Sequence, residues 1–157
     1  MAKDIIILCP YPFGKAPSQR FRFEQYILAN DLKSNITIRS FYSENGMNAL
    51  YGHNLFIKLA YLVWFLVRRF FHVLEALFYK KVFIHRELAP VGPPLFEFVL
   101  KLFNKKYTYD FDDAIWLSNV SDVNRKFDFF KAYWKVSNII KWANYITVGN
   151  GYLGNYA

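Results

Sequence analysis

The segment that most constrains the fold of this chain is residues 5–26, IIILCPYPFGKAPSQRFRFEQY. It begins with a short apolar run rich in β-branched residues, residues 5–8, which predicts a strand buried on both faces of a parallel sheet. Pro10 and Pro12 end this strand, and Gly14 allows a positive φ or the close approach of a ligand. The segment therefore predicts a strand followed directly by a tight loop.

A helix over residues 18–33 is predicted after this loop, with Ser18 as its N-cap. The N-terminus of a helix carries unpaired N–H groups and about half a positive charge, so it favours anions. Lys15 in the loop and Arg20 and Arg22 in the first helical turns would strengthen that preference. The alternative is an ordinary loop with solvated arginines, because the segment matches neither a Walker motif nor a GxGxxG fingerprint.

The rest of the chain alternates between predicted strands and helices. Strands are predicted at 36–43, 81–87, 106–114 and 145–149, helices at 54–79, 94–103, 124–143 and from 152 onward, and a loop around Gly46 and Gly52. Without a hairpin signal between them, five strands that alternate with helices imply right-handed crossovers. We predict an α/β fold: one Rossmann-like domain over 1–157, with a parallel sheet of about five strands and helices on both faces.

The loops after the first, third and fourth strands should meet at one edge of such a sheet, because the carboxyl ends of parallel strands lie together. Ligands of open α/β sheets bind at that edge. The residues that we expect to converge there are Gly14, Lys15, Arg20, His85, Arg86, Glu87, Asp110, Asp112 and Asp113.

The aspartates at the end of the fourth strand allow several interpretations. Asp110 and Asp112 should share one face of the strand, opposite Asp113, if the strand extends that far. Their oxygens could hold Mg²⁺, as in a stand-alone binding or response-type module. They could also pair with Arg86 or Arg20, accept hydrogen bonds from sugar hydroxyls, or simply cap a helix.

His85, Arg86 and Glu87 offer a general acid or base, an anion contact and a carboxylate. The sequence order shows no Ser-His-Asp signature, no CxxC pair and no Walker lysine. Cys9, the only cysteine, is expected to be a packing residue, and the lack of disulfides suggests a reducing cytoplasm. His72 is expected to be structural.

The composition indicates an apolar surface and an anionic partner. Hydrophobic residues make up 54% of the chain and aromatic residues 21%, and the formal net charge is +8. No nucleic-acid-binding module is recognisable, so we expect no nucleic-acid partner. A phosphorylated ligand or an anionic membrane surface remains possible on charge alone.

The predicted helix 54–79 is apolar almost all round. Lys58, Arg68 and Arg69 interrupt it, so a membrane span is not expected, and we predict that these cations and Trp64 face an anionic membrane surface. The alternatives are that the outer face packs on another domain or subunit, or that the helix anchors a membrane-inserted interaction protein.

Four motifs together resemble the N-terminal half of bacterial family 4 glycosyltransferases, which have the two-domain GT-B fold. In chain order they are PYPFGKAPSQRFRFEQY, FIHRELAPVGPP, YDFDDAIW and ITVGNGYLGNYA. The resemblance implies an acceptor-binding domain of a retaining enzyme. Such an enzyme transfers a sugar from a nucleotide-sugar donor to a glycan or lipid-linked acceptor in lipopolysaccharide or capsule synthesis.

The resemblance also assigns residues. Asp112 and Asp113 would face the catalytic cleft, and the contacts to the donor diphosphate or the acceptor would come from Phe13, Gly14, Lys15, Ala16, Ser18, Gln19 and Arg20, with His85, Arg86 and Glu87 nearby. The family does not generally need a bound metal or other cofactor. Its nucleotide-sugar-binding domain is expected after residue 157, so this fragment alone is expected to be inactive. The implied location is the cytoplasm, peripheral to the inner face of the plasma membrane.

Overall fold

The computed structural model describes residues 4–51, 54–117 and 131–157. The strands are β1 (Ile5–Cys9), β2 (Ile36–Ser40), β3 (Lys81–His85), β4 (Tyr107–Phe111) and β5 (Tyr145–Val148). The helices are α1 (Pro17–Gln19), the π-helical η1 (Arg20–Glu24), α2 (Gln25–Ala29), the 3₁₀ helix η2 (Leu32–Ser34), α3 (Glu44–Tyr51), α4 (Leu55–Ala76), α5 (Leu95–Leu102), α6 (Lys135–Trp142) and α7 (Gly151–Tyr156).

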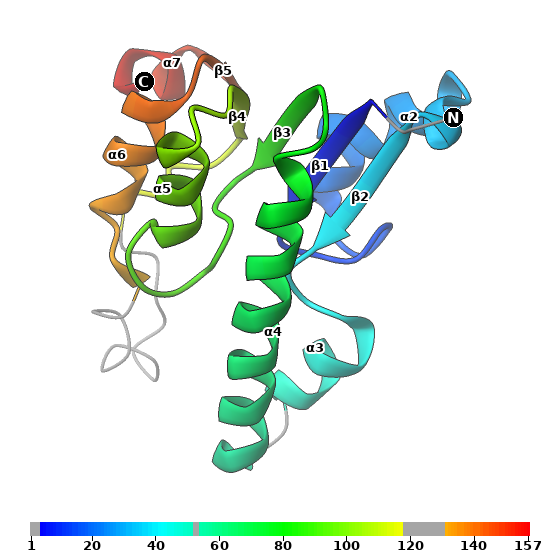
Figure 1. The fold of residues 1–157 in the computed structure, drawn as a ribbon, viewed down its shortest axis with the longest axis vertical. Coiled ribbons are helices and arrows are strands. Elements are labelled where there is room, and N and C mark those ends of the chain that lie inside the picture. The colour runs from blue at the N-terminus through cyan, green and yellow to red at the C-terminus, as the bar shows by residue number, and fades with distance from the viewer. Residues whose placement is uncertain (1–3, 52–53, 118–130) are drawn as a thin grey trace.

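All five strands are parallel and lie in the order β2-β1-β3-β4-β5. Figure 1 shows this twisted sheet with helices between successive strands. The predicted α/β class, the parallel sheet and the Rossmann-like arrangement are therefore confirmed. Because every strand runs the same way, all the loops that follow the strands leave from one edge.

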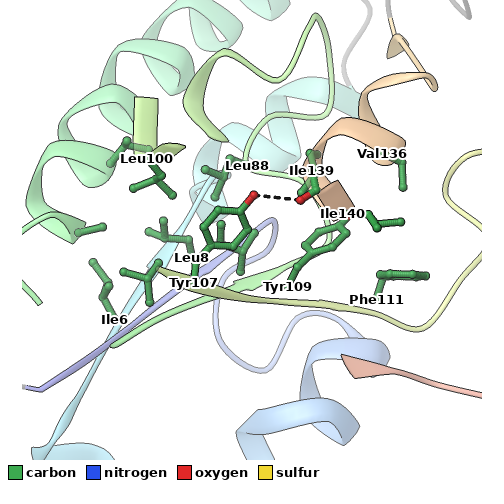
Figure 2. Close-up of a cluster of buried hydrophobic side chains, with 14 of the residues drawn as sticks. Ile6, Leu8, Leu88, Leu100, Tyr107, Tyr109, Phe111, Val136, Ile139 and Ile140 are labelled. Carbon is green, nitrogen blue, oxygen red and sulfur yellow. Dashed lines mark hydrogen bonds between the residues drawn. The ribbon is translucent and has the colours of Figure 1, made fainter. Parts of the chain in front are cut away.

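The two faces of the sheet are buried against different helices. Alternate residues of a strand point to opposite faces. Ile6 and Leu8 join a core cluster with the helices α4, α5 and α6, whereas Ile7 and Cys9 pack with Phe23 of η1 and with α2. Figure 2 shows part of the larger cluster, where the Tyr107 hydroxyl donates a 3.0 Å hydrogen bond to the Ile139 carbonyl. The expectation of helices on both faces is confirmed.

Several predicted boundaries differ from the structure. The first helical run begins at Pro17 rather than Ser18, because proline already has the φ of a helical first position; Ala16 is its N-cap. It ends at Ala29, before Asp31 takes a positive φ. The predicted loop around Gly46 contains the helix α3 instead.

Of the helix predicted over 124–143, only the part that forms α6 is confirmed. Residues 124–130 of that prediction lie outside the described residues. Ala132 has a positive φ, which interrupts a helix just before α6. The predicted fourth strand ends at Phe111, so Asp112 and Asp113 belong to the following loop.

The helix α4 is confirmed, with Asn54 as N-cap accepting hydrogen bonds from the N–H groups of Phe56 and Ile57. The assignment of Arg69 to a membrane face is wrong. Arg69 is fully buried and donates to the backbone carbonyls of Cys9 and Arg39 at 2.7 and 3.2 Å. It satisfies acceptors where β1 and β2 end.

Arg68 also turns inward, toward the carbonyl oxygen of Ser40 at 2.6 Å. Lys58 lies seven residues before the buried Phe65, on the same side of the helix. Trp64 is exposed, as predicted. Within the described residues no helix is long and apolar enough to cross a membrane.

Candidate functional site

Strand alternation places three polar side chains on one face of the sheet. Tyr109 and Phe111 of β4 point into the larger core, so Asp110 points to the opposite face, toward α1 and η1. His85 of β3 and Thr147 of β5 are its register partners on either side. Parallel pairing thus brings the three residues together.

Asp110 is the centre of this group and is only 1% exposed. Its Oδ1 accepts hydrogen bonds from Thr147 Oγ1 at 2.5 Å and from the Arg22 guanidinium, and its Oδ2 accepts from His85 Nδ1 at 2.7 Å. Burial alone would raise the pKa of Asp110, but the hydrogen bonds from His85, Arg22 and Thr147 hold it below its ordinary value. Asp110 is therefore a carboxylate at neutral pH.

Ser18 extends the group toward the loop that follows β1. Its Oγ lies 3.0 Å from His85 Nε2, and its side chain is half-buried, whereas His85 is fully buried. Ser18 is thus not the helix cap predicted from the sequence. It joins α1 to the end of β3, and through His85 to Asp110 of β4.

A second set of contacts fixes the loop itself. The Gln19 side chain is fully buried: its Oε1 accepts from the Tyr11 N–H at 2.8 Å and its Nε2 donates to the Tyr11 carbonyl at 2.9 Å. Glu24 accepts from the Gly14 N–H at 3.0 Å and from Gln19. Gly14 has φ 77°, which suits glycine. Gln19 therefore shapes the loop instead of offering its amide to a ligand.

A cavity of about 620 Å³ opens where the loops after β1, β3 and β4 meet. This volume lies within the usual range for small-molecule sites, about 300–1,000 Å³. The described residues that line it are Pro10, Tyr11, Tyr42, Arg86, Glu87, Pro90, Asp113, Ala114, Ile115, Leu117, Lys131, Tyr133 and Lys135. The predicted meeting of the three loops is confirmed.

The charged side chains that line this cavity are Arg86, Glu87, Asp113, Lys131 and Lys135. Arg86 pairs with Asp113 across 3.4 Å, and the Asp113 side chain is 64% exposed. Burial raises the pKa of Glu87, although Lys135 and Arg86 oppose the shift. Burial likewise lowers the pKa of Lys135, whose Nζ donates to the Ala89 carbonyl at 2.7 Å. Shifted acids and bases in a cavity are typical of functional sites.

Aromatic rings and an unpaired oxygen complete this edge. Tyr11 and Tyr42 stack with centroids 5.7 Å apart. Asp112 Oδ1 is buried, and it has no hydrogen-bond partner among the described residues. Gly149 packs so closely on Asp112 that an added Cβ would lie 3.2 Å from the Asp112 Cα. Asp112 is therefore held in place, and it is not among the residues that line the cavity.

Three predicted site residues do not join these clusters. Lys15 forms an exposed ion pair with Glu44 at 3.6 Å. Arg20 is exposed, and its guanidinium lies over the Phe21 ring. Phe13 is exposed beside Lys33. None of the three lines the cavity.

Sequence reasoning missed Thr147, Tyr11, Tyr42 and Lys135, and it placed Arg20 where the structure has Arg22. The signal for Thr147 was present, because alternation puts it on the same face as Asp110 once the strand order is known. Lys135 carried no such signal, since the bend before α6 brings it to the cavity.

The magnesium interpretation finds no support in the geometry of Asp110, whose two oxygens already accept hydrogen bonds from Arg22, His85 and Thr147. Among the described residues, no group of three or more His, Cys, Asp or Glu side chains is arranged to hold a metal ion. The Arg86–Asp113 pairing considered from the sequence does occur.

Comparison with known proteins does not identify a family. No family model matches the chain, and searches of the curated proteins and of the solved structures found no similar protein. The site has to be interpreted from its own geometry.

Proposed function

We propose that this domain binds the acceptor of a sugar-transfer reaction in the cavity beside Asp113. In this proposal it is the acceptor side of a retaining glycosyltransferase that uses a nucleotide-sugar donor, and the acceptor is a glycan or a lipid-linked sugar. The observation that carries the proposal is the cavity itself, which combines tyrosine rings, carboxylates and an arginine at the ligand-binding edge of the sheet. The four sequence motifs add support.

The chemistry of the lining suits a sugar. Tyrosine rings offer apolar faces to the C–H groups of a pyranose. Asp113 and Glu87 can accept hydrogen bonds from sugar hydroxyls, and Arg86 can donate to ring or hydroxyl oxygens.

The assignment of a donor-diphosphate contact to residues 13–16, Ser18 and Arg20 stays a prediction. The Gly14 N–H is already bound by Glu24, which reduces its capacity to hold a phosphate. The Lys15 and Arg20 side chains are exposed and could reach a diphosphate held by a second domain.

Membrane association also stays a prediction, but the surface that we propose for it is now the exposed apolar face of α4. One face of α4 exposes Phe56, Leu59, Val63, Val67 and Phe71, with Phe56 83% exposed. In Figure 1 the N-terminal half of α4 extends beyond the sheet with α3 beside it. Because the cations of α4 lie off this face, binding to a membrane would depend mainly on apolar insertion.

The acceptor proposal is tested by saturation-transfer NMR on this chain with a panel of mono- and disaccharides and with a UDP-sugar. We expect saccharide signals that weaken at least threefold when Tyr11 or Asp113 becomes Ala. The matched control is Phe98→Ser, an exposed residue of α5 that does not line the cavity. Equal signals in all variants, or binding of the UDP-sugar alone in this cavity, would contradict the proposal.

The membrane prediction is tested by vesicle flotation. The double variant Phe56→Ser/Phe71→Ser should bind phosphatidylglycerol-containing vesicles less than the wild type, and added salt should change the wild-type binding little. Phe98→Ser again serves as the control for the loss of an exposed ring elsewhere. Equal flotation of the double variant and the wild type would contradict this surface.

A further inference from the structure

Three residues from three separate elements form a continuous hydrogen-bonded chain. Ser18 Oγ of α1 lies 3.0 Å from His85 Nε2 of β3, and His85 Nδ1 lies 2.7 Å from Asp110 Oδ2 of β4. This is the connectivity of a serine nucleophile, its base and the carboxylate that orients the base. Such a group is recognised by geometry, and no order along the chain is required.

The protonation pattern follows from Asp110. Arg22 and Thr147 donate to the same carboxyl group, which keeps it ionised and acceptor-only. His85 must therefore carry a proton on Nδ1. In the neutral ring, Nε2 then holds a lone pair directed at Ser18, which can accept the hydroxyl proton.

The burial of the group limits what it can do. His85 is fully buried, whereas Ser18 is half-buried beside the loop after β1. The imidazole can take a proton from Ser18, but a leaving group has no open path to receive that proton directly. A substrate must therefore carry a leaving group that departs as an anion.

We propose that Ser18 is a nucleophilic serine, activated by His85 and Asp110, that accepts an acyl group from an ester with an acidic leaving group. Ser18 Oγ forms the new bond to the acyl carbon while its proton moves to His85 Nε2. The ester C–O bond breaks, and the leaving group takes the bonding electron pair. The imidazolium that results is stabilised by the Asp110 carboxylate. This activity does not depend on the sugar-transfer proposal.

The first experiment uses p-nitrophenyl acetate with the full chain. We expect a burst of nitrophenolate of about one equivalent and an acetyl group located on Ser18 by mass spectrometry. Ser18→Ala should abolish the burst. His85→Asn should reduce its rate at least tenfold, since the asparagine amide can still donate to Asp110 but offers no base to Ser18. Acetylation elsewhere, or an unchanged burst in His85→Asn, would overturn the proposal.

A second experiment does not require the ester to fit. Ser18→Cys places a thiol beside His85, and Cys9 is an internal control because burial raises its pKa to about 12. Iodoacetamide at neutral pH should alkylate Cys at position 18 about tenfold faster than in the double variant Ser18→Cys/His85→Asn, because thiolate is the reactive form. Circular dichroism checks that each variant folds. Equal alkylation rates in the two backgrounds would show that His85 does not activate this position.

Discussion

Two aspartates three residues apart at the end of β4 occupy opposite kinds of environment. Asp110 is 1% exposed and accepts hydrogen bonds from three side chains. Asp113 is 64% exposed and has one ion pair, at 3.4 Å. The comparison teaches that Asp110 holds the sheet edge together, whereas Asp113 is available to a ligand in the cavity.

The largest effect on stability is expected at the buried aspartate, Asp110. Asp110→Ala should lower the free energy of unfolding by about 3 kcal/mol, because it leaves His85 and Arg22 without their shared carboxylate. Urea denaturation followed by circular dichroism measures the change. A loss below about 1 kcal/mol would mean that Asp110 is not the centre of the network.

A smaller loss is expected at Thr147. Thr147→Val keeps the side-chain shape and removes the hydroxyl that donates to Asp110 at 2.5 Å. The free energy of unfolding should fall by about 1 kcal/mol, the usual net value of one hydrogen bond. If Asp110 is already held by Arg22 and His85 alone, the urea midpoint will not move.

A pH experiment sharpens the comparison with a third carboxyl. Glu97 is 2% exposed, and among the described residues its hydrogen bonds come from backbone N–H groups, including that of Leu88; burial raises its pKa. A raised folded-state pKa means that Glu97 weakens the fold as pH rises above its unfolded value, about 4.3. The wild type should therefore lose stability relative to Glu97→Gln between pH 4 and pH 7. Urea midpoints at both pH values give the result.

Asp110 should act in the opposite direction, in a range below about pH 4. Its folded-state pKa is lowered, so its contribution is present above about pH 4 and is lost as pH falls through the folded value. If the stability of the Glu97→Gln variant relative to the wild type instead falls from pH 4 to pH 7, the contrast between Asp110 and Glu97 is contradicted.

The smallest effect on stability is expected at Asp113. Asp113→Ala should change the free energy of unfolding by less than about 0.5 kcal/mol, as for other exposed ion pairs. The same variant is expected to weaken saccharide binding in the NMR experiment. A destabilisation as large as that of Asp110→Ala would remove the distinction between the two aspartates.

Much of the architecture could be predicted because it depends on local pattern. The apolar run at residues 5–8, the prolines after it and the alternation of strands with helices were enough for the parallel sheet. The helix α3 was missed because a glycine such as Gly46 usually indicates a loop. In the structure the Phe65 ring packs against Gly46 and leaves no room for a Cβ there. Such close packing is a tertiary property.

The site was predicted only in part. That the loops after β1, β3 and β4 would meet follows from parallel strands, and it holds for Tyr11, Arg86 and Asp113. Which arginine reaches Asp110 does not follow, because it depends on which side of the segment η1 packs toward β4. The inward turn of Arg69 likewise depends on carbonyl groups at the ends of β1 and β2.

The sequence by itself determined the parallel α/β sheet and the edge at which its polar residues gather, because strand period and loop residues act over a few positions. Only the tertiary structure decided which of those residues meet. Ser18, His85 and Asp110 are separated by 67 and 25 positions along the chain. Their contact depends on strand order and helix phase, which no local pattern specifies.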